Sequence, residues 1–411
     1  MVNYRNYQLE IIDQGLSVLK KTKLLYLAME VRTGKTLTSL GICEQLGVEN
    51  VLFITKKKAI SSITDDYDKM CPVNFSLFTT NYESLHKIPK IKWHAIIADE
   101  SHSMGAFPKP SKRSKAVKEL IQMNDPYFIL LSGTPTPESY SQMYHQVWGH
   151  KSNPFLSHKN FYHFAKTYVN VVQKKINGFN LNDYSRGSSN IIEKMKPFTI
   201  SYSQKEAGFK STIKENILFV PMNQQTYNIS SILKKDLVYE NEGEFILGDT
   251  SVKLMTKLHQ LYSGTIKYES GNSEVLDTSK AKFIRERFKG KKIGIFYKFK
   301  EELNALKEVF GKDDLTVDLK EFDESEKHIA LQIVSGREGI SLRNADYIVY
   351  YNIDFSATSY WQSRDRMTTK NRLHNEVYWI FSEKGIEGRI YKAVSNKKDY
   401  TLKHFKRDYN I

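Results

Sequence analysis

The stretch LLYLAMEVRTGKTLTSLGICEQL, residues 24–46, decides the fold of the first half of the chain. It begins with the apolar run LLYLAM at 24–29 and passes through EVRTGKT at 30–36 into the helical LTSLGICEQL. A continuous apolar run is typical of a strand buried on both faces of a parallel sheet, and a helix after it is typical of a crossover connection. The stretch therefore predicts a strand, a tight loop and a helix.

Further apolar runs of this kind follow in the first half, each bounded by turn or polar residues. They are VLFIT at 51–55, HAIIADE at 94–100 and FILLSG at 128–133. Strands that alternate with amphipathic helical stretches indicate a doubly wound α/β domain. From about 140 to 275 the sequence has aromatic and basic helical stretches with polar interruptions, so we expect helical insertions and a connecting region there.

The alternation returns after residue 290 and predicts a second α/β lobe. The runs are KKIGIFY at 291–297, followed by the helical EELNALKEVF, then HIALQIV at 328–334, DYIVYYNI at 346–353 and EVYWIFS at 376–382. Two α/β lobes in tandem follow from this repeated pattern.

Composition and charge narrow the class of protein. The chain has 411 residues, and its 61 Lys and Arg against 46 Asp and Glu leave a formal net charge of +15. A hydrophobic fraction of 40% and ten prolines are those of a folded globular protein, which excludes intrinsic disorder for most of the chain. The positive charge favours a polyanionic partner, because binding to phosphates releases condensed counterions, but it does not separate DNA from RNA.

The cysteines and the apolar runs bear on the location of the protein. Cys43 and Cys71 cannot form a tetrahedral metal site by themselves, and we interpret them as reduced thiols in a reducing cytosol. No apolar run approaches the roughly 18 residues that span a bilayer, and the first ten residues are polar where a signal peptide is apolar. We expect a cytoplasmic monomer without a membrane partner, from a bacterial or phage-infected cell.

The loop at 30–36 carries the first chemical signal. Gly34, Lys35 and Thr36 stand directly before a helix, where backbone N–H groups and the helix dipole favour a polyphosphate. Lys35 would reach the terminal phosphates and Thr36 would hold Mg²⁺. The first glycine of the P-loop pattern falls at Met29, so this motif alone is an incomplete match.

Two polar segments follow apolar runs at the expected carboxyl ends of strands. Asp99 and Glu100 end HAIIADE, where Asp99 would bind Mg²⁺ and Glu100 would orient or deprotonate an attacking water. Ser132 and Thr134 belong to SGTP, which directly follows FILL. Taken alone, the acidic pair would be interpreted as a solvated strand end, and SGTP as a turn.

The order of these segments resembles a known family. MEVRTGKT, DESH and LSGTP are similar to motifs I, II and III of superfamily 2 helicases and nucleic-acid translocases, while VSGREGISL at 334–342 and WQSRDRM at 361–367 resemble motifs V and VI. YRNYQ at 4–8, TTNYESL at 79–85 and GIEGRIYKAVSNKKD at 385–399 are similar to flanking segments of the Swi/Snf-like branch, whose members couple ATP hydrolysis to movement along double-stranded DNA. The resemblance covers most of the chain.

This resemblance implies two tandem RecA-like doubly wound parallel-sheet lobes with helical insertions between them. The N-terminal ATP-binding lobe is expected over 1–215, and the C-terminal lobe, with a helical connector and motifs V and VI, over 216–411. It implies a nucleic-acid-dependent ATPase, a DNA translocase or helicase, that uses ATP and Mg²⁺ in the cleft between the lobes. The implied partner is duplex or branched DNA, with replication or recombination proteins as further candidates.

The family's roles carry over to matching residues of this chain. The residues expected to bind ATP and its magnesium are Gln8 at the adenine, Thr33, Gly34, Lys35, Thr36 and Asp99 at the phosphates and metal, and Gly339 and Gln362 from the second lobe. The residues expected to carry out hydrolysis are Lys35, Asp99, Glu100 and Arg366. Ser132 and Thr134 would link the nucleotide state to the grip on nucleic acid.

Motif VI departs from the family pattern, which places arginines four and seven residues after the glutamine. Arg366 fills the first place, but the second falls on Thr369. Lys370 shares the helical face of Arg366, and Arg372 or Arg364 could reach the second place by a local shift. An arginine finger supplies about 10³ to 10⁵ in rate, so without a replacement the chain would be an ATP-gated nucleic-acid clamp with weak hydrolysis.

Nucleic-acid contacts are expected from the segment after the apolar run VLFIT and from the start of TTNYESL. The basic candidates, at the place of the family's motif Ia, are Lys56, Lys57 and Lys58, with a solvated basic turn as the alternative. The uncharged candidates for phosphate contacts are Thr79, Thr80 and Asn81. An RNA-directed ATPase stays open as a third function, although the Swi/Snf-like segments favour DNA.

The aromatic stretch NFYHFAKTYVNVV at 160–172 has two interpretations. Aromatic side chains can stack on the bases of single strands. At helical spacing, however, Phe161, Phe164 and Tyr168 make one apolar stripe, so we favour core packing.

Overall fold

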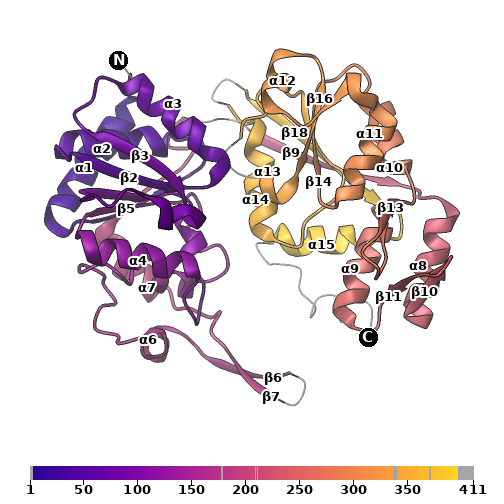
Figure 1. The fold of residues 1–411 in the computed structure, drawn as a ribbon, viewed down its shortest axis with the longest axis horizontal. Coiled ribbons are helices and arrows are strands. Elements are labelled where there is room, and N and C mark those ends of the chain that lie inside the picture. The colour runs from indigo at the N-terminus through magenta and orange to yellow at the C-terminus, as the bar shows by residue number, and fades with distance from the viewer. Residues whose placement is uncertain are drawn as a thin grey trace. The chain divides into compact units, whose positions relative to one another are not determined.

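The computed structural model describes residues 3–176, 179–208, 210, 212–336, 340–369 and 372–396. The chain divides into two compact units, Met1–Phe209 and Lys210–Ile411, and each contains a six-stranded sheet (Figure 1). Within the described ranges, no helix is long and apolar enough to cross a membrane.

The sheet of the first unit is parallel throughout, in the order β3-β2-β4-β5-β1-β8. Its strands are β1 (Leu24–Met29), β2 (Asn50–Thr55), β3 (Ser76–Asn81), β4 (Ala95–Ala98), β5 (Tyr127–Leu131) and β8 (Thr199–Tyr202). The four strands predicted from apolar runs are β1, β2, β4 and β5, and they occupy the middle of the sheet. Their residues are almost entirely buried because helices cover both faces.

Alternate side chains of the first sheet enter two separate cores. Leu25 and Leu27 of β1 pack with α1 (Asn6–Thr22), α2 (Lys35–Leu46) and α3 (Ile60–Met70). Leu24 and Tyr26 face the other core, with α4 (Lys112–Asn124), α5 (Met143–Val147), α6 (Phe161–Tyr168) and α7 (Asn190–Met195). This is the doubly wound arrangement expected from the sequence (Figure 1).

The sheet of the second unit is also parallel, in the order β15-β16-β14-β17-β18-β9. Its strands are β9 (Thr212–Val220), β14 (Ile293–Tyr297), β15 (Leu315–Thr316), β16 (His328–Gln332), β17 (Tyr347–Tyr350) and β18 (His374–Ser382). One core contains residues of α10 (Ser279–Arg287) and α11 (Lys300–Asp314). The other contains residues of α8 (Gln224–Asp236), α9 (Ser251–Leu261), α12 (Leu319–Glu324), α13 (Ile333–Gly336), α14 (Ala357–Arg364) and α15 (Glu387–Val394). Two doubly wound, RecA-like α/β lobes are therefore confirmed.

The region from 140 to 275 is less helical than the sequence predicts. It contains α5 to α9, but also three antiparallel hairpins, formed by β6 (Val172–Ile176) and β7 (Phe179–Asp183), β10 (Val238–Asn241) and β11 (Glu244–Leu247), and β12 (Thr265–Lys267) and β13 (Ser273–Val275). It also supplies one edge strand to each sheet, β8 and β9. These edge strands are only partly buried, so they lack the continuous apolar runs of central strands.

Two further expectations concern single side chains. Phe161 and Phe164 of α6 are buried, and Tyr168 packs against the same core, which confirms core packing for the aromatic stretch. Cys43 is buried in α2, and this burial raises the pKa of its thiol to about 12. Cys71, directly after α3, is exposed.

Candidate active site

Three of the predicted motifs meet at one edge of the first sheet. β4, β5 and β1 are neighbours, and because they are parallel, they all end at the same edge. The segments that follow them are residues 30–34, the pair Asp99 and Glu100, and the turn that holds Ser132 and Thr134. In open parallel sheets, ligands bind outside the carboxyl ends of the strands. The structure thus brings together residues that the sequence places about a hundred positions apart.

The loop before α2 is a tight turn that requires glycine. Gly34 has a φ of +84°, and a Cβ at this position would lie 2.4 Å from Nε2 of Gln8. The ammonium of Lys35, the first residue of α2, donates to the carbonyl oxygens of Met29 at 2.9 Å and of Glu30 at 3.3 Å. The lysine thus lies over the loop, and its contact with phosphate oxygens stays a prediction.

The beginning of α1 braces this loop. The amide of Gln8 is buried, donating to the carbonyl oxygen of Gly34 at 3.3 Å and accepting from the backbone N–H of Arg5 at 3.0 Å. The hydroxyl of Tyr7 donates to the carbonyl oxygen of Thr33 at 3.0 Å. The structure places Gln8 beside the loop at residues 30–34, called the nucleotide loop below after its predicted role, and the contact of Gln8 with adenine stays a prediction.

A segment that sequence reasoning missed holds the other side of the loop. The backbone N–H of Glu30 donates to the carbonyl oxygen of Tyr202, the last residue of β8, at 2.9 Å. Gln204 donates from its backbone to Oε2 of Glu30 at 2.7 Å and from its side chain to the carbonyl oxygen of Val31 at 2.9 Å. No motif marks Gln204; only the pairing of β8 with β1 brings it here.

Asp99 and Glu100 form the acidic part of the site. The hydroxyl of Thr55 donates to Oδ2 of Asp99 at 2.8 Å, and the hydroxyl of Tyr82 donates to its carbonyl oxygen at 2.6 Å. Loss of solvent and the adjacent charge of Glu100 raise the pKa of Asp99 to about 6, against the opposing effects of Lys35 and Thr55. Glu100 has a φ of +47°, an uncommon conformation for a residue other than glycine.

These residues fit a magnesium ion. The hydroxyl of Thr36 and the carboxylate of Asp99 are oxygen ligands, the kind that Mg²⁺ prefers. Burial and the adjacent carboxylate of Glu100 raise the pKa of Asp99, and a divalent cation would offset the charge of this acidic pair. Thr36 and Asp99 would therefore hold the ion.

The pKa of Asp99 gives a pH prediction. Mg²⁺ affinity should fall as the pH drops through about 6, because protonated Asp99 is a poor ligand. Since the folded-state pKa lies above the usual value of 3.8, the protonated form of Asp99 favours the folded state. This contribution to stability is complete below about pH 4 and is lost as the pH rises through about 6. Calorimetric titration of the protein and a non-hydrolysable ATP analogue with Mg²⁺, from pH 5 to 8, measures the midpoint. Thr55→Val removes a hydrogen bond to the carboxylate and should raise that midpoint; an unchanged midpoint would contradict the assignment.

Ser132 connects the acidic segment to the SGTP turn. Its hydroxyl lies 3.0 Å from Nδ1 of His102 and accepts from the backbone N–H of Thr134 at 3.1 Å. The same Nδ1 of His102 lies 3.3 Å from Oε2 of Glu100. A single imidazole thus touches the predicted general base and the predicted coupling residue, which sequence reasoning did not anticipate for His102. The coupling role of Ser132 and Thr134 stays a prediction.

A buried network below these turns was also missed. Tyr26 of β1 donates from its hydroxyl to Oε1 of Gln146 at 2.8 Å and accepts from the hydroxyl of Ser101 at 2.8 Å. Nε2 of Gln146 donates to the carbonyl oxygen of Pro135 at 2.9 Å. The network ties DESH and SGTP to the strand that precedes the nucleotide loop.

The predicted nucleic-acid residues lie on the same sheet edge, beyond the acidic segment. β2 and β3 are neighbours, and Thr55 pairs with Asn81 at their ends. Lys57 and Lys58 are exposed in the turn after β2. The other candidates are less exposed. Three of them are half-buried, namely Lys56, Thr79 and Asn81, and Thr80 is buried. Asn81 also accepts a hydrogen bond from the backbone of Glu83 at 3.1 Å.

In the second unit, Gln362 lies on α14 and Arg366 follows in a short 3₁₀ turn, and both are buried. The guanidinium of Arg366 donates to the carbonyl oxygen of Gln362 at 2.9 Å and to that of Ile340 at 3.3 Å. The structure thus brings motif VI against the end of motif V. The predicted residues Gly339 and Lys370 lie outside the described residues.

The place of the second motif VI arginine is Thr369, and the guanidinium groups of Arg364 and Arg372 bind other residues. Arg364 binds the carboxylate of Glu215 with Nη1, 2.8 Å from Oε1. Arg372 donates to the carbonyl oxygen of Ala345 at 2.6 Å and to the carbonyl oxygen of Asp346. In this structure both guanidinium groups hold other parts of the second unit.

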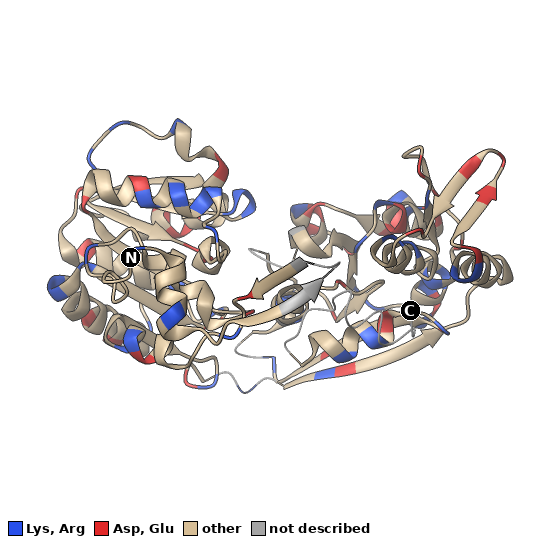
Figure 2. Cartoon of the chain, turned by 90° about the horizontal axis from the view of Figure 1, so that it is seen from below, with Lys and Arg blue, Asp and Glu red and all other residues tan. Residues whose placement is uncertain are grey.

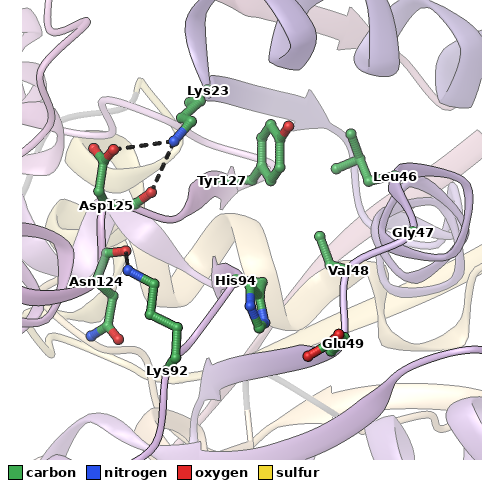
Figure 3. A pocket seen from close by; sticks show the side chains of 10 residues that line it. All are labelled: Lys23, Leu46, Gly47, Val48, Glu49, Lys92, His94, Asn124, Asp125 and Tyr127. Atoms are coloured by element: carbon green, nitrogen blue, oxygen red, sulfur yellow. Dashed lines mark hydrogen bonds and ion pairs between the residues drawn. The ribbon is translucent and has the colours of Figure 1, made fainter.

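A pocket of about 360 Å³ lies at the opposite edge of the first sheet (Figure 3). It is lined by Lys23, Glu49 and His94. These residues directly precede β1, β2 and β4, which begin at this edge. Among its charged groups, Lys23 binds Asp125 at 3.1 Å and Lys92 donates to the carbonyl oxygen of Asn124. This pocket is therefore separate from the edge where the motifs meet.

Comparison with known proteins identifies the family. A model of the SNF2-related domain matches residues 48–264, more than half of the chain. The Arabidopsis thaliana CHD3-type chromatin-remodeling factor CHR7 is 21% identical over an alignment of 354 residues, which covers 79% of this chain and 28% of that protein. This chain therefore spans less than a third of that relative's length.

Among solved structures, the Sulfolobus solfataricus SWI2/SNF2 ATPase core in complex with dsDNA aligns with a TM-score of 0.44 and 16% identity, over all of this chain and 95% of that one. The Sulfolobus solfataricus SWI2/SNF2 ATPase core domain, a second solved structure, aligns with a TM-score of 0.41 and 16% identity, over 97% of this chain and 89% of that one. On the match of the family model to more than half of its residues, the chain belongs to the SNF2-related domain family.

Proposed function

We propose that this protein is an ATP-dependent DNA translocase or helicase that moves along or remodels double-stranded or branched DNA. One observation carries the proposal: the phosphate loop with Lys35, the acidic pair Asp99 and Glu100, and the turn with Ser132 meet at one edge of a parallel sheet. Membership of the SNF2-related family supports ATP as the nucleotide.

Each residue of the site has a chemical part in this proposal. Lys35 neutralises the terminal phosphates, Thr36 and Asp99 hold the magnesium ion, and Glu100 deprotonates the attacking water. Mg²⁺, when bound, offsets charge on the phosphate oxygens. Arg366, from the second unit, stabilises the charge that develops during transfer of the phosphoryl group to water, which releases ADP and phosphate.

Double-stranded DNA is the proposed track. The Arabidopsis relative is a chromatin-remodeling factor, and the net charge of +15 favours a polyanion. Lys and Arg occur on helices of both units, interspersed with acidic residues, so bulk charge does not locate the DNA surface (Figure 2). We assign it instead to the ends of β2 and β3, where Lys57 and Lys58 are exposed.

The decisive experiment is steady-state ATP hydrolysis with no nucleic acid and then with duplex DNA, forked DNA, single-stranded DNA and RNA. Strong stimulation by duplex or forked DNA is the expected result, and strand-displacement and triplex-displacement assays would then separate a helicase from a translocase. Stimulation by RNA alone would replace DNA with RNA as the partner.

An ATP-gated nucleic-acid clamp is the second candidate function. The observation in its favour is that Arg364 and Arg372, the two arginines considered as replacements for the one missing at Thr369, are bound to other groups. A clamp would show tighter DNA binding with ATP but no turnover with any nucleic acid, and the same assays therefore distinguish the two functions.

The assignment of the DNA surface gives a charge-reversal prediction. Lys57→Glu/Lys58→Glu should weaken duplex binding and reduce its salt dependence, because two phosphate contacts are lost, while ATP hydrolysis without DNA stays unchanged. Fluorescence anisotropy at several salt concentrations measures both effects.

The matched control carries the same change in charge. Lys20→Glu/Lys21→Glu alters the exposed last turn of α1, which leads into the opposite edge of the sheet. Equal weakening by both double variants would mean that net charge alone explains binding and would remove the assignment.

A further inference from the structure

The carboxylate of Glu215 has an unusual number of hydrogen-bond donors. Glu215 lies on β9, the edge strand of the second sheet. It accepts from Nη1 of Arg364 at 2.8 Å, the hydroxyl of Tyr360 at 2.7 Å, Nε1 of Trp379 at 2.8 Å and the hydroxyl of Tyr391 at 3.1 Å. Its side chain is 15% exposed, and that of Arg364 is 19% exposed. A carboxylate so surrounded accepts charge-assisted hydrogen bonds that are little weakened by water.

Two of the four donors lie on α14, the helix that carries motif VI. Tyr360 and Arg364 are separated by one helical turn, and Gln362 lies between them. Arg366 follows two residues after Arg364, in the turn that ends the helix. Glu215 therefore joins the edge strand to the helix immediately before the predicted arginine finger.

Aromatic side chains fix the same end of the helix. The guanidinium of Arg364 lies 4.0 Å from the ring centroid of Trp361, and the ring of Tyr360 stacks on Trp379 with centroids 5.3 Å apart. Trp379 belongs to β18, which pairs with β9. A cation held between a carboxylate and an indole ring has little freedom to move, so these contacts restrain this end of α14.

We propose that Glu215 is a positioning residue for ATP hydrolysis: through Arg364 and Tyr360 it holds α14 so that Arg366 is correctly placed. This inference rests on the proposed function. It also gives Arg364 a part in the site other than the replacement of the missing arginine at Thr369. Small displacements of a catalytic group can cost about a hundredfold in rate, which makes a buried anchor of the helix measurable in turnover.

The test is Glu215→Gln, which keeps the size of the side chain and removes its charge. We expect kcat for DNA-stimulated ATP hydrolysis to fall about tenfold or more, with KM for ATP and the Kd for duplex DNA changed less than about twofold. Thermal unfolding of each variant provides the comparison for stability.

The matched control is Glu376→Gln on the neighbouring strand β18. Glu376 accepts from the hydroxyl of Tyr378 at 2.5 Å and from Nδ2 of Asn216 at 3.2 Å. It is thus a carboxylate of the same sheet, and these two partners lie on β18 and β9 rather than on α14. It should keep the wild-type kcat. An equal fall in kcat for both variants would reduce the role of Glu215 to the stability of the sheet and overturn the inference.

A second pair of variants tests the route through α14. Arg364→Met should lower kcat as Glu215→Gln does. The double variant should resemble either single variant, because both changes break the same interaction between Arg364 and Glu215. Additive losses would overturn the inference. Tyr360→Phe, which removes one donor and keeps the ring, should give a smaller loss in the same direction, and it replaces Glu215→Gln if that variant does not fold.

The failure of the inference and that of the proposed function give different results. Wild-type protein that does not hydrolyse ATP with any nucleic acid would overturn the proposed function and the inference with it. Wild-type protein that hydrolyses ATP while Glu215→Gln does so at the same rate would overturn the inference alone.

Discussion

Lys35→Ala is expected to abolish measurable ATP turnover while leaving basal DNA binding intact. The ammonium lies over the loop at 30–34, held by two backbone carbonyl oxygens, and it is the first side chain of α2. Removal of one donor to a developing charge costs about 10² to 10³ in kcat, and this lysine also contributes to binding of the nucleotide.

The variant should fold normally, because the two hydrogen bonds that it loses, to the carbonyl oxygens of Met29 and Glu30, are only half-buried and exposed, respectively. Turnover is measured by release of phosphate with saturating duplex DNA, nucleotide binding with a fluorescent ATP analogue, and DNA binding by anisotropy. Lys20→Ala, on the exposed end of α1, is the control for loss of a lysine. Wild-type turnover in Lys35→Ala would refute the assignment of the site.

Arg366→Ala is expected to slow turnover by about 10³-fold or more while ATP still binds. An arginine finger of this strength lowers the barrier by about 4 to 7 kcal/mol. The reason for expecting a large effect is that Thr369 stands at the second arginine position and that Arg364 and Arg372 are engaged elsewhere. Arg366 stands at the first arginine position of motif VI, and this prediction assigns the contact with phosphate to it.

Arg366 also contacts the carbonyl oxygens of Gln362 and Ile340, so the alanine variant loses packing contacts as well. Arg366→Lys separates the two effects, because lysine keeps the charge but lacks the planar fork of guanidinium. We expect it to recover stability and little of the rate. Single-turnover kinetics with a fluorescent ATP analogue measures the chemical step, and a normal rate in Arg366→Ala would show that the second unit acts through another residue.

Much of the fold could be predicted because its central strands are buried on both faces. The runs at 24–29, 51–55, 94–100 and 128–133 correspond to β1, β2, β4 and β5, and those of the second half to β14, β16, β17 and β18. β3, β8 and β9 were not predicted as strands, because partial exposure replaces a continuous apolar run with mixed residues. The strand at 328–334 also ends earlier than expected, since α13 begins at Ile333.

The candidate site was predictable where chemistry is concentrated in consecutive residues, as in GKT, DESH and SGTP. Contacts that depend on the order of strands were not. Gln204 reaches the nucleotide loop because β8 pairs with β1, and Glu215 reaches Arg364 because β9 pairs with β18, whose Trp379 completes the same cluster. Pairing between strands so far apart in sequence leaves no local pattern to detect.

The contrast between the two cysteines makes the native protein suitable for fluorescence labelling. The thiol of Cys43 is buried and protonated at neutral pH, since its pKa is raised to about 12, whereas that of Cys71 is exposed. A maleimide dye should therefore attach at Cys71 alone, because the thiolate is the reacting species. A second dye on a cysteine introduced at the exposed Lys307 of α11 would report, by energy transfer in single molecules, on motion between the two units during each cycle of ATP.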